Sequence, residues 1–537
     1  MDRRFRRVYF FAFLGNFSLE LAYMAFFSAI IRNAFVIDGR GGPGRKADLG
    51  VENDKIGAVG DLSGERAEIE VDADGLYLSP GFIDLTSHSD TRWTLFDESL
   101  QESFLHQGIT TVMGGSCGES LAPFTKPEDV SFANINWQSL SEFLEELERR
   151  GLGLNFGTLI GHGTLRSASG TDITRAASKE EVDRMVFLLI QSLKAGAFGL
   201  SFSLGRSRAL FSQDAELRRL ADELKKFSCP AFHHLPNEGP DIISSVSRFV
   251  ALSRESGAAG HISHFKVLGK KSWPSQRQVF EMIERAREDG LALTIDVFPY
   301  TRTGSSLYLL LPAWALEGGK TAILKRIGDK KERGQIVEAL KALTLHYERV
   351  IVASTRLNAG IAGKSLKEIA DGAGMGPEEM FLEILAANEL EVEIFNETIS
   401  EENLNEAVLK DYAAISSDGA GLGLKEGPNL PHPRSFGAFP RALKSFVREK
   451  SLLSWEKAVY KMTGLPAQIL GLEKRGVIEK GYFADLVLFN PGTISDFADY
   501  KTPRLLSKGV EWLFINGTPV ITGGTLDGKF AGRVLRK

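Results

Sequence analysis

The sequence predicts an α/β protein centred on a (β/α)₈ barrel, and three observations support this fold class. Eight short apolar runs recur along the chain, and the first seven follow one another at intervals of 29 residues (His88 to Cys117) to 45 residues (Cys117 to His162). Amphipathic stretches between them, such as 138–150 and 179–195, predict helices, so successive strands are expected to be parallel. Hairpin patterns at both chain ends predict a further β domain built from the two ends.

The composition is that of a globular protein with a sizeable core. The 537 residues include 64 Lys+Arg and 69 Asp+Glu, which gives a formal net charge of −5, and 43% of the residues are hydrophobic. These values exclude a wholly disordered chain, a collagen-like fibre and a polytopic membrane protein. No stretch is basic enough to indicate nucleic acid as a partner, and two cysteines exclude a disulfide framework.

Residues 1–27 are predicted to form an apolar leader, for which two interpretations stay open. Four arginines precede a largely apolar stretch from Val8 to Ile31, which is typical of a signal or an anchor. The alternative is an over-extended start with Met24 as the working initiator, because the strand pattern of 29–37 must belong to the folded domain. The over-extended start predicts a cytoplasmic protein, whereas an anchor would hold the protein at a membrane or lead to its export.

The first and last segments of the folded part carry hairpin patterns. Residues 29–37 are interpreted as two short strands around a turn, and residues 47–62 alternate around Asn53-Asp54. Near the C-terminus, residues 512–521 form a hairpin pattern around Asn516-Gly517, a favoured two-residue turn. We therefore expect residues 28–79 and 473–537 to combine into one β-sandwich.

Residues 80–472 are predicted to form the barrel. The eight apolar runs end near His88, Cys117, His162, Leu204, His234, His264, Pro299 and Asp418. The interval from Pro299 to Asp418 is too long for one strand and helix, so it is expected to contain an insertion at about 317–405. Helical patterns at 321–343 and 377–388 flank a strand pattern at 350–352, which predicts a subdomain over the barrel mouth.

Polar residues suited to metal binding stand at the C-terminal ends of the predicted strands. They are His88, Cys117, His162, His234, His264 and Asp418. A barrel brings these strand ends together at one rim, where active sites lie. Zinc favours imidazole, thiolate and carboxylate ligands, and three protein ligands leave one position open for water. The sequence therefore predicts a catalytic metal site at this rim.

A different enzyme class has to be weighed for one of these segments. Residues 114–118 fit the G-x-S-x-G pattern of a nucleophile elbow, with Ser116 or Cys117 as the nucleophile. Such an elbow needs a helix directly after the nucleophile, but here a polar loop containing Pro123 follows. The order of the strands, which is that of a barrel, also disfavours a serine or cysteine hydrolase.

A series of motifs carries a family resemblance over nearly the whole chain, from about residue 29 to 537. The motifs are PGFID (80–84), HSD (88–90), GSCG (115–118), GHGTLR (161–166), HLPNEG (234–239), ISHFK (262–266), FPY (298–300), LPAWALEGG (311–319), SDG (417–419), PHPR (431–434) and RGVI (475–478). In order and spacing, the chain resembles the N-acyl-D-amino-acid deacylases, or D-aminoacylases, of the amidohydrolase superfamily. Such a series is specific for the family and much less so for the substrate.

The resemblance implies a zinc ion held tightly by Cys117, His234 and His264, with His88 as a further metal ligand and Asp418 as the proton-transfer group. A water molecule activated by zinc would attack the amide carbonyl of a small-molecule N-acyl-D-amino acid, giving a carboxylate and a free amino acid. No organic cofactor is needed for this reaction. The resemblance also implies a β-sandwich at the joined ends and an insertion before the last strand.

Four further residues match positions that, in the family, hold the substrate carboxylate and polarise the acyl carbonyl. They are Lys266, Tyr300, Ser306 and Arg434. A guanidinium makes two parallel hydrogen bonds to a carboxylate, and an ammonium adds a point charge nearby.

The sequence departs from the family pattern at two positions. Thr86 stands where the first-strand motif usually has the first of two histidines, so we expect one tightly bound zinc ion and a doubtful second site. Pro236 stands where an Arg is common before Asn-Glu-Gly, so side-chain or acyl preference is expected to differ. The alternatives are hydrolysis of another amide, such as a cyclic amide or an acyl amino sugar, or a degenerate barrel that only binds ligand. The substrate's stereochemistry and side chain and the oligomeric state stay open.

Overall fold

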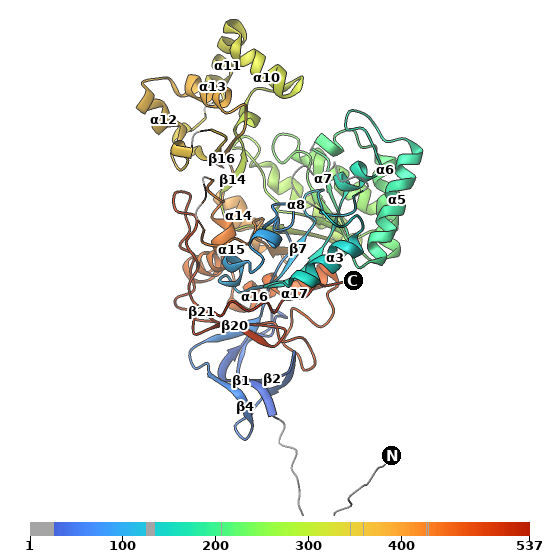
Figure 1. The fold of residues 1–537 in the computed structure, drawn as a ribbon, viewed down its shortest axis with the longest axis vertical. Helices are drawn as coiled ribbons and strands as arrows, with labels where there is room; N and C mark the ends of the chain where they lie inside the picture. The colour runs from blue at the N-terminus through green and yellow to red at the C-terminus, as the bar shows by residue number, and fades with distance from the viewer. Residues whose placement is uncertain are drawn as a thin grey trace, which may run out of the picture.

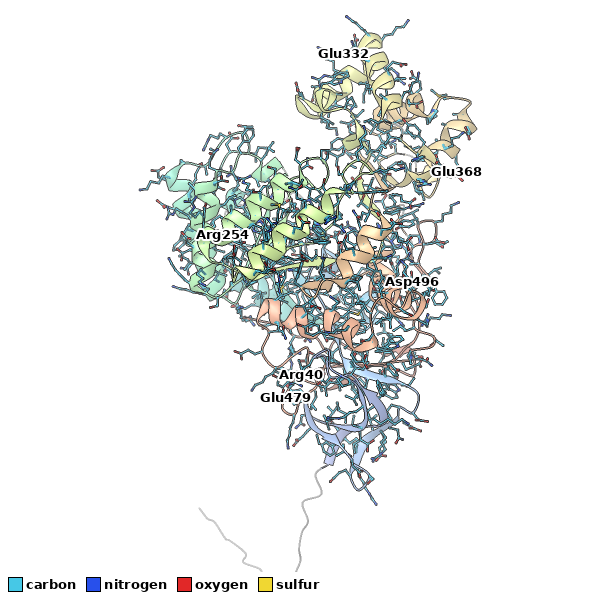
Figure 2. The ribbon with its side chains drawn as sticks, turned by 180° about the vertical axis from the view of Figure 1, so that it is seen from behind. Arg40, Arg254, Glu332, Glu368, Glu479 and Asp496 are labelled. Atoms are coloured by element: carbon cyan, nitrogen blue, oxygen red, sulfur yellow. The ribbon has the colours of Figure 1, made fainter. Side chains whose placement is uncertain are left out.

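The structure is a computed structural model that describes residues 26–124 and 135–537, apart from residues 206, 344, 358, 426 and 428. Most of the leader predicted for residues 1–27 therefore lies outside the described residues. Figure 1 shows three parts in a row: a β-sheet domain at the bottom, a central α/β barrel, and an insertion at the top. Figure 2 shows the same three parts from behind, with Glu332 and Glu368 on the insertion.

The barrel consists of two parallel sheets that meet on both sides. One sheet holds β6 (Phe82–Asp84), β7 (Ile109–Gly114) and β8 (Asn155–Thr158), and the other β9 (Ile160–Gly161), β10 (Leu200–Ser203), β11 (Ala231–His234), β12 (Gly260–Ile262), β13 (Leu293–Val297) and β17 (Ala413–Ile415). β8 and β9 are two parts of one run interrupted at Leu159, whose amide donates to Gly114. On the other side a parallel bridge joins Ser87 to Gly419. The predicted eight-stranded (β/α)₈ architecture is confirmed.

Helices surround the strands as the periodicity predicts. They are α1 (Thr94–Asp97), α2 (Glu102–Leu105), α3 (Leu140–Arg150), α4 (His162–Ala168), α5 (Lys179–Lys194), α6 (Asp214–Lys226), α7 (Ile242–Ser256), α8 (Ser275–Glu288), α14 (Glu401–Leu409), α15 (Arg434–Ala442), the π-helix η6 (Leu443–Glu449), α16 (Trp455–Met462) and α17 (Gly464–Leu470). The predicted helices at 138–150 and 179–195 are α3 and α5. Each begins with a capping box, Ser139 with Glu142 and Ser178 with Glu181, which satisfies amide groups of the first turn.

Strands from both chain ends form one sheet of nine strands. The first end supplies β1 (Phe26–Val36), β2 (Arg45–Glu52), β3 (Lys55–Gly60), β4 (Arg66–Asp72) and β5 (Tyr77–Pro80), and the second β18 (Leu486–Phe489), β19 (Val510–Ile515), β20 (Thr518–Thr522) and β21 (Thr525–Leu526). Antiparallel pairing of β5 with β18 joins the two ends. An ion pair between Arg40 and Glu479, both labelled in Figure 2, links the ends again. The two chain ends thus share one sheet domain, as predicted, and its form as a sandwich of residues 28–79 and 473–537 stays a prediction.

The structure corrects one hairpin and confirms two others. Residues 29–37 do not form two strands around a turn: residues 29–36 lie in the single strand β1, which carries a bulge between Ile31 and Ala34. Asn33 has a φ of 60° there, a left-handed conformation that asparagine tolerates. The residue that predicted a turn therefore forms part of a bulge. The hairpins around Asn53-Asp54 and Asn516-Gly517 are the pairs β2/β3 and β19/β20.

The insertion between β13 and β17 is a small subdomain with its own core. Its antiparallel sheet has the order β14 (Arg302–Ser306), β16 (Val392–Glu397) and β15 (Ile351–Thr355). Its helices are α9 (Ala313–Leu316), α10 (Gly319–Gly328), α11 (Lys330–Ala342), α12 (Leu366–Ala373) and α13 (Pro377–Ala387). A separate cluster that includes Leu340, Phe381 and Leu385 is buried inside the subdomain. Across the whole described chain, no helix has the length and apolar character that crossing a membrane would require.

Candidate active site

Three candidate metal ligands converge at the C-terminal ends of the barrel strands. Cys117 follows β7, His234 ends β11 and His264 follows β12, and their ligand atoms all lie within 4.8 Å of one another. Cys117 Sγ is 3.2 Å from His264 Nε2, and the rings of His234 and His264 meet edge to face at 4.5 Å. Cys117 and His264 are buried. One thiolate and two imidazoles are a ligand set that fits zinc, and the buried Nδ1 of His234 has no partner among the described residues.

The backbone at these positions adopts a conformation that non-glycine residues rarely take. Cys117, His264 and Asp418 have φ values of 54°, 41° and 49°, and they follow three different strands. Such residues cost about 1–3 kcal/mol each and cluster at functional sites, where the surrounding structure holds them in place. Gly115 allows the turn that leads to Cys117, because a Cβ atom there would lie 1.9 Å from the carbonyl oxygen of Leu159.

The electrostatics of the three residues favour a cation between them. Burial alone would raise the pKa of the Cys117 thiol, but His264 and His234 lower it well below its usual range. Burial and Lys266 lower the pKa of His264, whereas Asp418 and Cys117 raise it, with a net result of about 10. The cluster thus holds a thiolate that a metal ion can share with both imidazoles in place of protons.

Asp418 and His88 lie beside this cluster. Asp418 Oδ1 is 3.1 Å from His88 Nε2, and Asp418 Oδ2 is 2.5 Å from the guanidinium of Arg434. His88 Nε2 is also 4.0 Å from Cys117 Sγ. Burial opposes ionisation of Asp418, yet Arg434, His264 and His88 hold its pKa well below the usual range. The carboxylate is therefore ionised, which is the state a proton acceptor needs.

Thr86 makes a hydrogen bond to a carboxylate and does not act as a metal ligand. Its buried hydroxyl donates to Asp296 Oδ2 at 2.8 Å, and the imidazole of His261 contacts the same oxygen at 2.8 Å. The other oxygen of Asp296 accepts the backbone amide of His264 at 2.9 Å. Thr86 thus supports the carboxylate that holds the strained backbone of His264.

The four predicted substrate-binding residues fall into two groups. Lys266 lies at the cluster: its ammonium is 2.6 Å from Glu238 and 2.9 Å from His264 Nδ1. Arg434 stacks over the ring of Phe298 at 5.0 Å, and its buried Nε has no partner among the described residues.

The positions of the other two residues, Tyr300 and Ser306, give less support to a role in substrate binding. Tyr300 is buried, and its hydroxyl also lacks a partner among the described residues. Ser306 lies on β14 of the insertion, where its hydroxyl donates to Glu393 on the neighbouring strand. The structure thus brings Lys266 and Arg434 to the cluster but engages Ser306 within the inserted sheet.

His162 does not join the cluster, contrary to its expected place with the other rim residues. It begins α4 and is fully buried, with Nε2 2.7 Å from Glu216. Arg166 pairs with the same carboxylate at 2.7 Å. His162 therefore belongs to a buried ionic group between α4 and α6.

Sequence reasoning missed two carboxylates that support the cluster. Glu238 lies 3.4 Å from His264 Nδ1 and contacts Lys266, and Asp296 holds the His264 amide. Such groups orient metal-binding imidazoles and tune their basicity. A signal existed for both, because Glu238 stands in the HLPNEG motif and Asp296 is the one charged residue in the segment 293–297.

The nucleophile-elbow alternative finds no support in this geometry. The buried hydroxyl of Ser116 has no hydrogen-bond partner among the described residues, so no described base contacts it. Gly118 to Phe124 form no helix after it. Cys117, the other candidate nucleophile, faces two imidazoles in the manner of a metal ligand.

Comparisons with known proteins point to one family of enzymes. The family model described as "Amidohydrolase family" matches residues 426–521. A D-aminoacylase from Alcaligenes xylosoxydans xylosoxydans is 30% identical over 95% of this chain and 98% of its own length. An N-acyl-D-glutamate deacylase from the same organism is 31% identical over 95% and 96% of the two chains.

A solved structure shares the whole architecture. The crystal structure of an N-acyl-D-glutamate deacylase from Bordetella bronchiseptica, in complex with zinc and a phosphonate inhibitor that mimics the tetrahedral intermediate, superposes with a TM-score of 0.81. It is 28% identical in sequence, and the match covers 95% of this chain and 100% of that one.

Proposed function

Because this chain belongs to the N-acyl-D-amino-acid deacylase family of amidohydrolases, we propose that it hydrolyses the amide bond of N-acyl-D-amino acids with zinc as its cofactor. The observation that carries the proposal is the cluster of Cys117, His234 and His264 with an ionised Asp418 beside it. A barrel that only binds ligand has no need of this set, so the degenerate-barrel alternative is disfavoured.

Cys117, His234 and His264 would hold the zinc ion, and His88 stands beside Cys117 as a weaker additional ligand. Zinc supplies a Lewis acid there, which polarises the amide carbonyl and makes water more acidic. Glu238 and Asp296 support the ligands, the first next to His264 Nδ1 and the second at the His264 amide.

Asp418 is the group that moves the proton in this proposal. Its carboxylate accepts a proton from the attacking water and returns it to the nitrogen of the leaving amine. His88 and Arg434 each contact one carboxylate oxygen and so fix its orientation. The free amino acid and the carboxylate of the acyl group then leave, and the carboxylate of Asp418 is regenerated.

The substrate carboxylate and acyl oxygen would meet the polar groups that line the same mouth. The Nε–H of Arg434, which has no partner among the described residues, and the ammonium of Lys266 suit a carboxylate. Tyr300 joins this set through the family resemblance alone, since its side chain is buried. Ser306 joins this set through the family resemblance alone, since its hydroxyl is engaged with Glu393. These donors favour an N-acyl amino acid over a cyclic amide or an acyl amino sugar.

The test is a hydrolysis screen with the zinc-loaded protein. Matched N-acetyl-D- and N-acetyl-L-amino acids with aliphatic, aromatic and acidic side chains are compared, together with a cyclic ureide and an N-acetylated amino sugar. We expect release of free amino acid from D-substrates, loss of activity after chelation, and recovery with zinc. Turnover confined to the cyclic ureide or the amino sugar, or full activity in metal-free protein, would contradict the proposal.

We also propose that the enzyme works in the cytoplasm on this small-molecule substrate. The support is chemical: Cys117 and Cys229 are buried and unpaired, and the site needs Cys117 as a thiolate, a state that a reducing compartment maintains. Fractionation of the native cells tests this, and recovery of the enzyme in the membrane fraction would favour the anchor interpretation of residues 1–27.

A further inference from the structure

His432, the histidine of the PHPR motif, lies where the barrel, the insertion and the C-terminal segment meet. Its side chain is 5% exposed. Four aromatic rings surround the imidazole at 5.2 to 6.5 Å between centroids, all at steep angles to it: Phe298 and Tyr300 after β13, Phe395 of β16, and Tyr500 in the segment before β19. This enclosure leaves the two ring nitrogens to partners within the protein.

Both ring nitrogens of His432 have such a partner. Nδ1 accepts the backbone N–H of Arg434 at 3.1 Å, and Nε2 lies 3.0 Å from the carbonyl oxygen of Arg302, the first residue of β14. An amide N–H can only donate and a carbonyl oxygen can only accept, so the proton is on Nε2 and Nδ1 keeps its lone pair. Burial and the charge of Arg434 also lower the pKa of His432 well below its usual range, which keeps the ring neutral.

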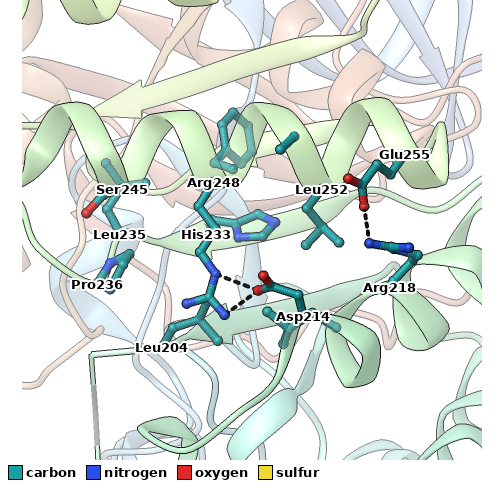
Figure 3. A pocket seen from close by; sticks show the side chains of 13 residues that line it. Leu204, Asp214, Arg218, His233, Leu235, Pro236, Ser245, Arg248, Leu252 and Glu255 are labelled. Atoms are coloured by element: carbon teal, nitrogen blue, oxygen red, sulfur yellow. Dashed lines mark hydrogen bonds and ion pairs between the residues drawn. The ribbon is translucent and has the colours of Figure 1, made fainter.

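A second buried histidine shows that aromatic packing does not by itself supply such partners. His233, labelled in Figure 3, packs between Phe202 and Phe249, with ring centroids 4.8 and 4.9 Å away. Its Nε2 nevertheless has no hydrogen-bond partner among the described residues. The two hydrogen bonds of His432 therefore point to a role beyond filling space.

The bond to Nδ1 holds the beginning of α15. Arg434 is the first residue of this helix, and the first amides of a helix have no partner within it. The imidazole of His432 accepts the amide of Arg434. The backbone carbonyls of the two residues before the helix accept the next two amides, those of Ser435 and Phe436, at 3.0 and 2.9 Å. The backbone of Arg434 is thereby fixed relative to β14.

The position of the Arg434 side chain depends on this fixed backbone. The guanidinium lies over the ring of Phe298 at 5.0 Å and pairs with Asp418 at 2.5 Å. The residue is 8% exposed, and its Nε–H has no partner among the described residues. A guanidinium held in place in this way loses little freedom when it binds a carboxylate, so a shift of its backbone would weaken that contact.

We propose that His432 is a positioning residue for recognition of the substrate carboxylate: its imidazole fixes the backbone of Arg434, whose guanidinium meets that carboxylate. This inference rests on the proposed function, in which Arg434 is a carboxylate-binding group. The carbonyl of Arg302 holds the proton on Nε2, so that Nδ1 stays an acceptor.

The test compares the binding of two phosphonamidates to the zinc-loaded protein by calorimetry. N-(methylphosphonyl)-D-leucine carries the substrate carboxylate, and N-isopentyl methylphosphonamidate lacks it. Both present the same tetrahedral phosphorus group, so the ratio of their dissociation constants isolates the effect of the carboxylate. We expect wild type to prefer the first compound by about tenfold or more.

Three substitutions separate positioning from packing. His432→Phe keeps a ring among the four aromatic side chains and loses both hydrogen bonds, and His432→Gln keeps a donor near the position of Nε2 but loses the acceptor. Both are expected to reduce the preference about fivefold or more. His432→Asn places an oxygen near the position of Nδ1 and should keep most of the preference, although it fills the space less well. A role in packing predicts the reverse order for Phe and Asn.

His346→Asn is the control, because His346 is exposed on the insertion and pairs with Glu348 at 3.3 Å. Thermal unfolding shows which variants fold. An unchanged preference in folded His432→Phe or His432→Gln overturns the proposal and leaves the proposed function intact. An equal loss in His432→Asn, or failure of both the Phe and the Gln variant to fold, also overturns it. A wild type that does not prefer the carboxylate compound contradicts the proposed function itself, and this inference falls with it.

Discussion

Asp418 shows how one residue's surroundings set its chemical state. It is buried, which by itself would favour the protonated acid. Arg434 at 2.5 Å outweighs this effect, with His264 and His88 adding to it, and the pKa of Asp418 stays well below its usual range. The group is therefore a carboxylate through the neutral pH range and can accept a proton without prior ionisation.

Asp418→Asn is expected to lower kcat by about 10²–10⁴, because the carboxamide keeps the shape of the side chain and loses the proton acceptor. Zinc content should stay unchanged, since Cys117, His234 and His264 are intact. Asp411→Asn, the same change at an exposed position just before β17, is the control and should behave as wild type. Kinetics and elemental analysis of both variants provide the measurement. Near-normal turnover in Asp418→Asn would place the proton acceptor elsewhere.

We expect Thr86 to limit the number of metal ions that the site holds. The threonine hydroxyl donates to Asp296, so the second position has His88 and a shared Cys117 thiolate as its nearest described ligands. Open zinc sites use three protein ligands, so this position is incomplete. We expect one zinc ion per chain to survive dialysis of the wild-type protein.

Two substitutions should change the zinc content per chain in opposite directions. Thr86→His is expected to add or strengthen a second zinc ion, and Cys117→Ala should empty the first site because it removes the thiolate. Cys229→Ala is the control, since Cys229 is also buried but hydrogen-bonds to backbone carbonyls away from the cluster. Elemental analysis after dialysis measures zinc per chain. Two tightly held ions in the wild type would show that another group completes the second site.

At the scale of elements, one buried lysine connects α16 to the beginning of the last barrel strand, β17. Lys461 is 2% exposed and donates to the carbonyl oxygens of Ala413, at 3.1 Å, and of Lys410. Burial lowers the pKa of Lys461 to about 8 from its ordinary 10.5, even though Asp411 raises it. Keeping this ammonium charged in the folded protein therefore lowers the free energy of unfolding.

The cost of Lys461 should appear as a pH dependence of stability. Below pH 8 both the folded and the unfolded chain keep the proton, so the folded state bears the full cost. Between about pH 8 and 10.5 the folded chain loses the proton first, so this residue makes stability rise, by at most about 3 kcal/mol. Lys461→Met should lack this rise. Urea unfolding of both proteins across the range measures it, and parallel pH profiles for the two would contradict the assignment.

The ends of the barrel strands show which site residues could be predicted from the sequence and which could not. Cys117, His234, His264 and Asp418 could be predicted because each stands where an apolar run ends, and parallel strands bring their ends to one rim. His162 obeys the same rule, yet it turns into α4 and pairs with a carboxylate 54 residues away, which no local pattern indicates.

The prediction of a turn at Asn33 is wrong for a related reason. A left-handed residue serves a turn or a bulge equally well, and the choice depends on strands β2, β4 and β5 that pair with β1. The local sequence thus determines the conformation of the residue, whereas the surrounding sheet determines whether a turn or a bulge forms.

At the scale of the whole molecule, the composite sheet makes the two chain ends depend on each other. β5 pairs with β18, and the core of this domain draws on both ends, with Ile31 and Leu49 from the first and Leu486 and Phe514 from the second. The pairing of the ends could be predicted from matching hairpin patterns. Its hydrogen-bonded form, one sheet of nine strands, follows from contacts between segments more than 400 residues apart, which no sequence pattern specifies.

This dependence gives a test of the leader. A chain that begins at Met24 keeps all of β1, including the buried Ala29 and Ile31, and so keeps the ladders to β2, β4 and β5. We expect it to fold with an unchanged thermal midpoint and unchanged kcat/KM. A chain that begins at Gly42 is the control: it loses β1, which leaves one edge of each of three strands unpaired and opens the core, so it should be insoluble or inactive. If the chain from Met24 fails as the control does, residues 1–23 contribute to folding, and the over-extended start is wrong.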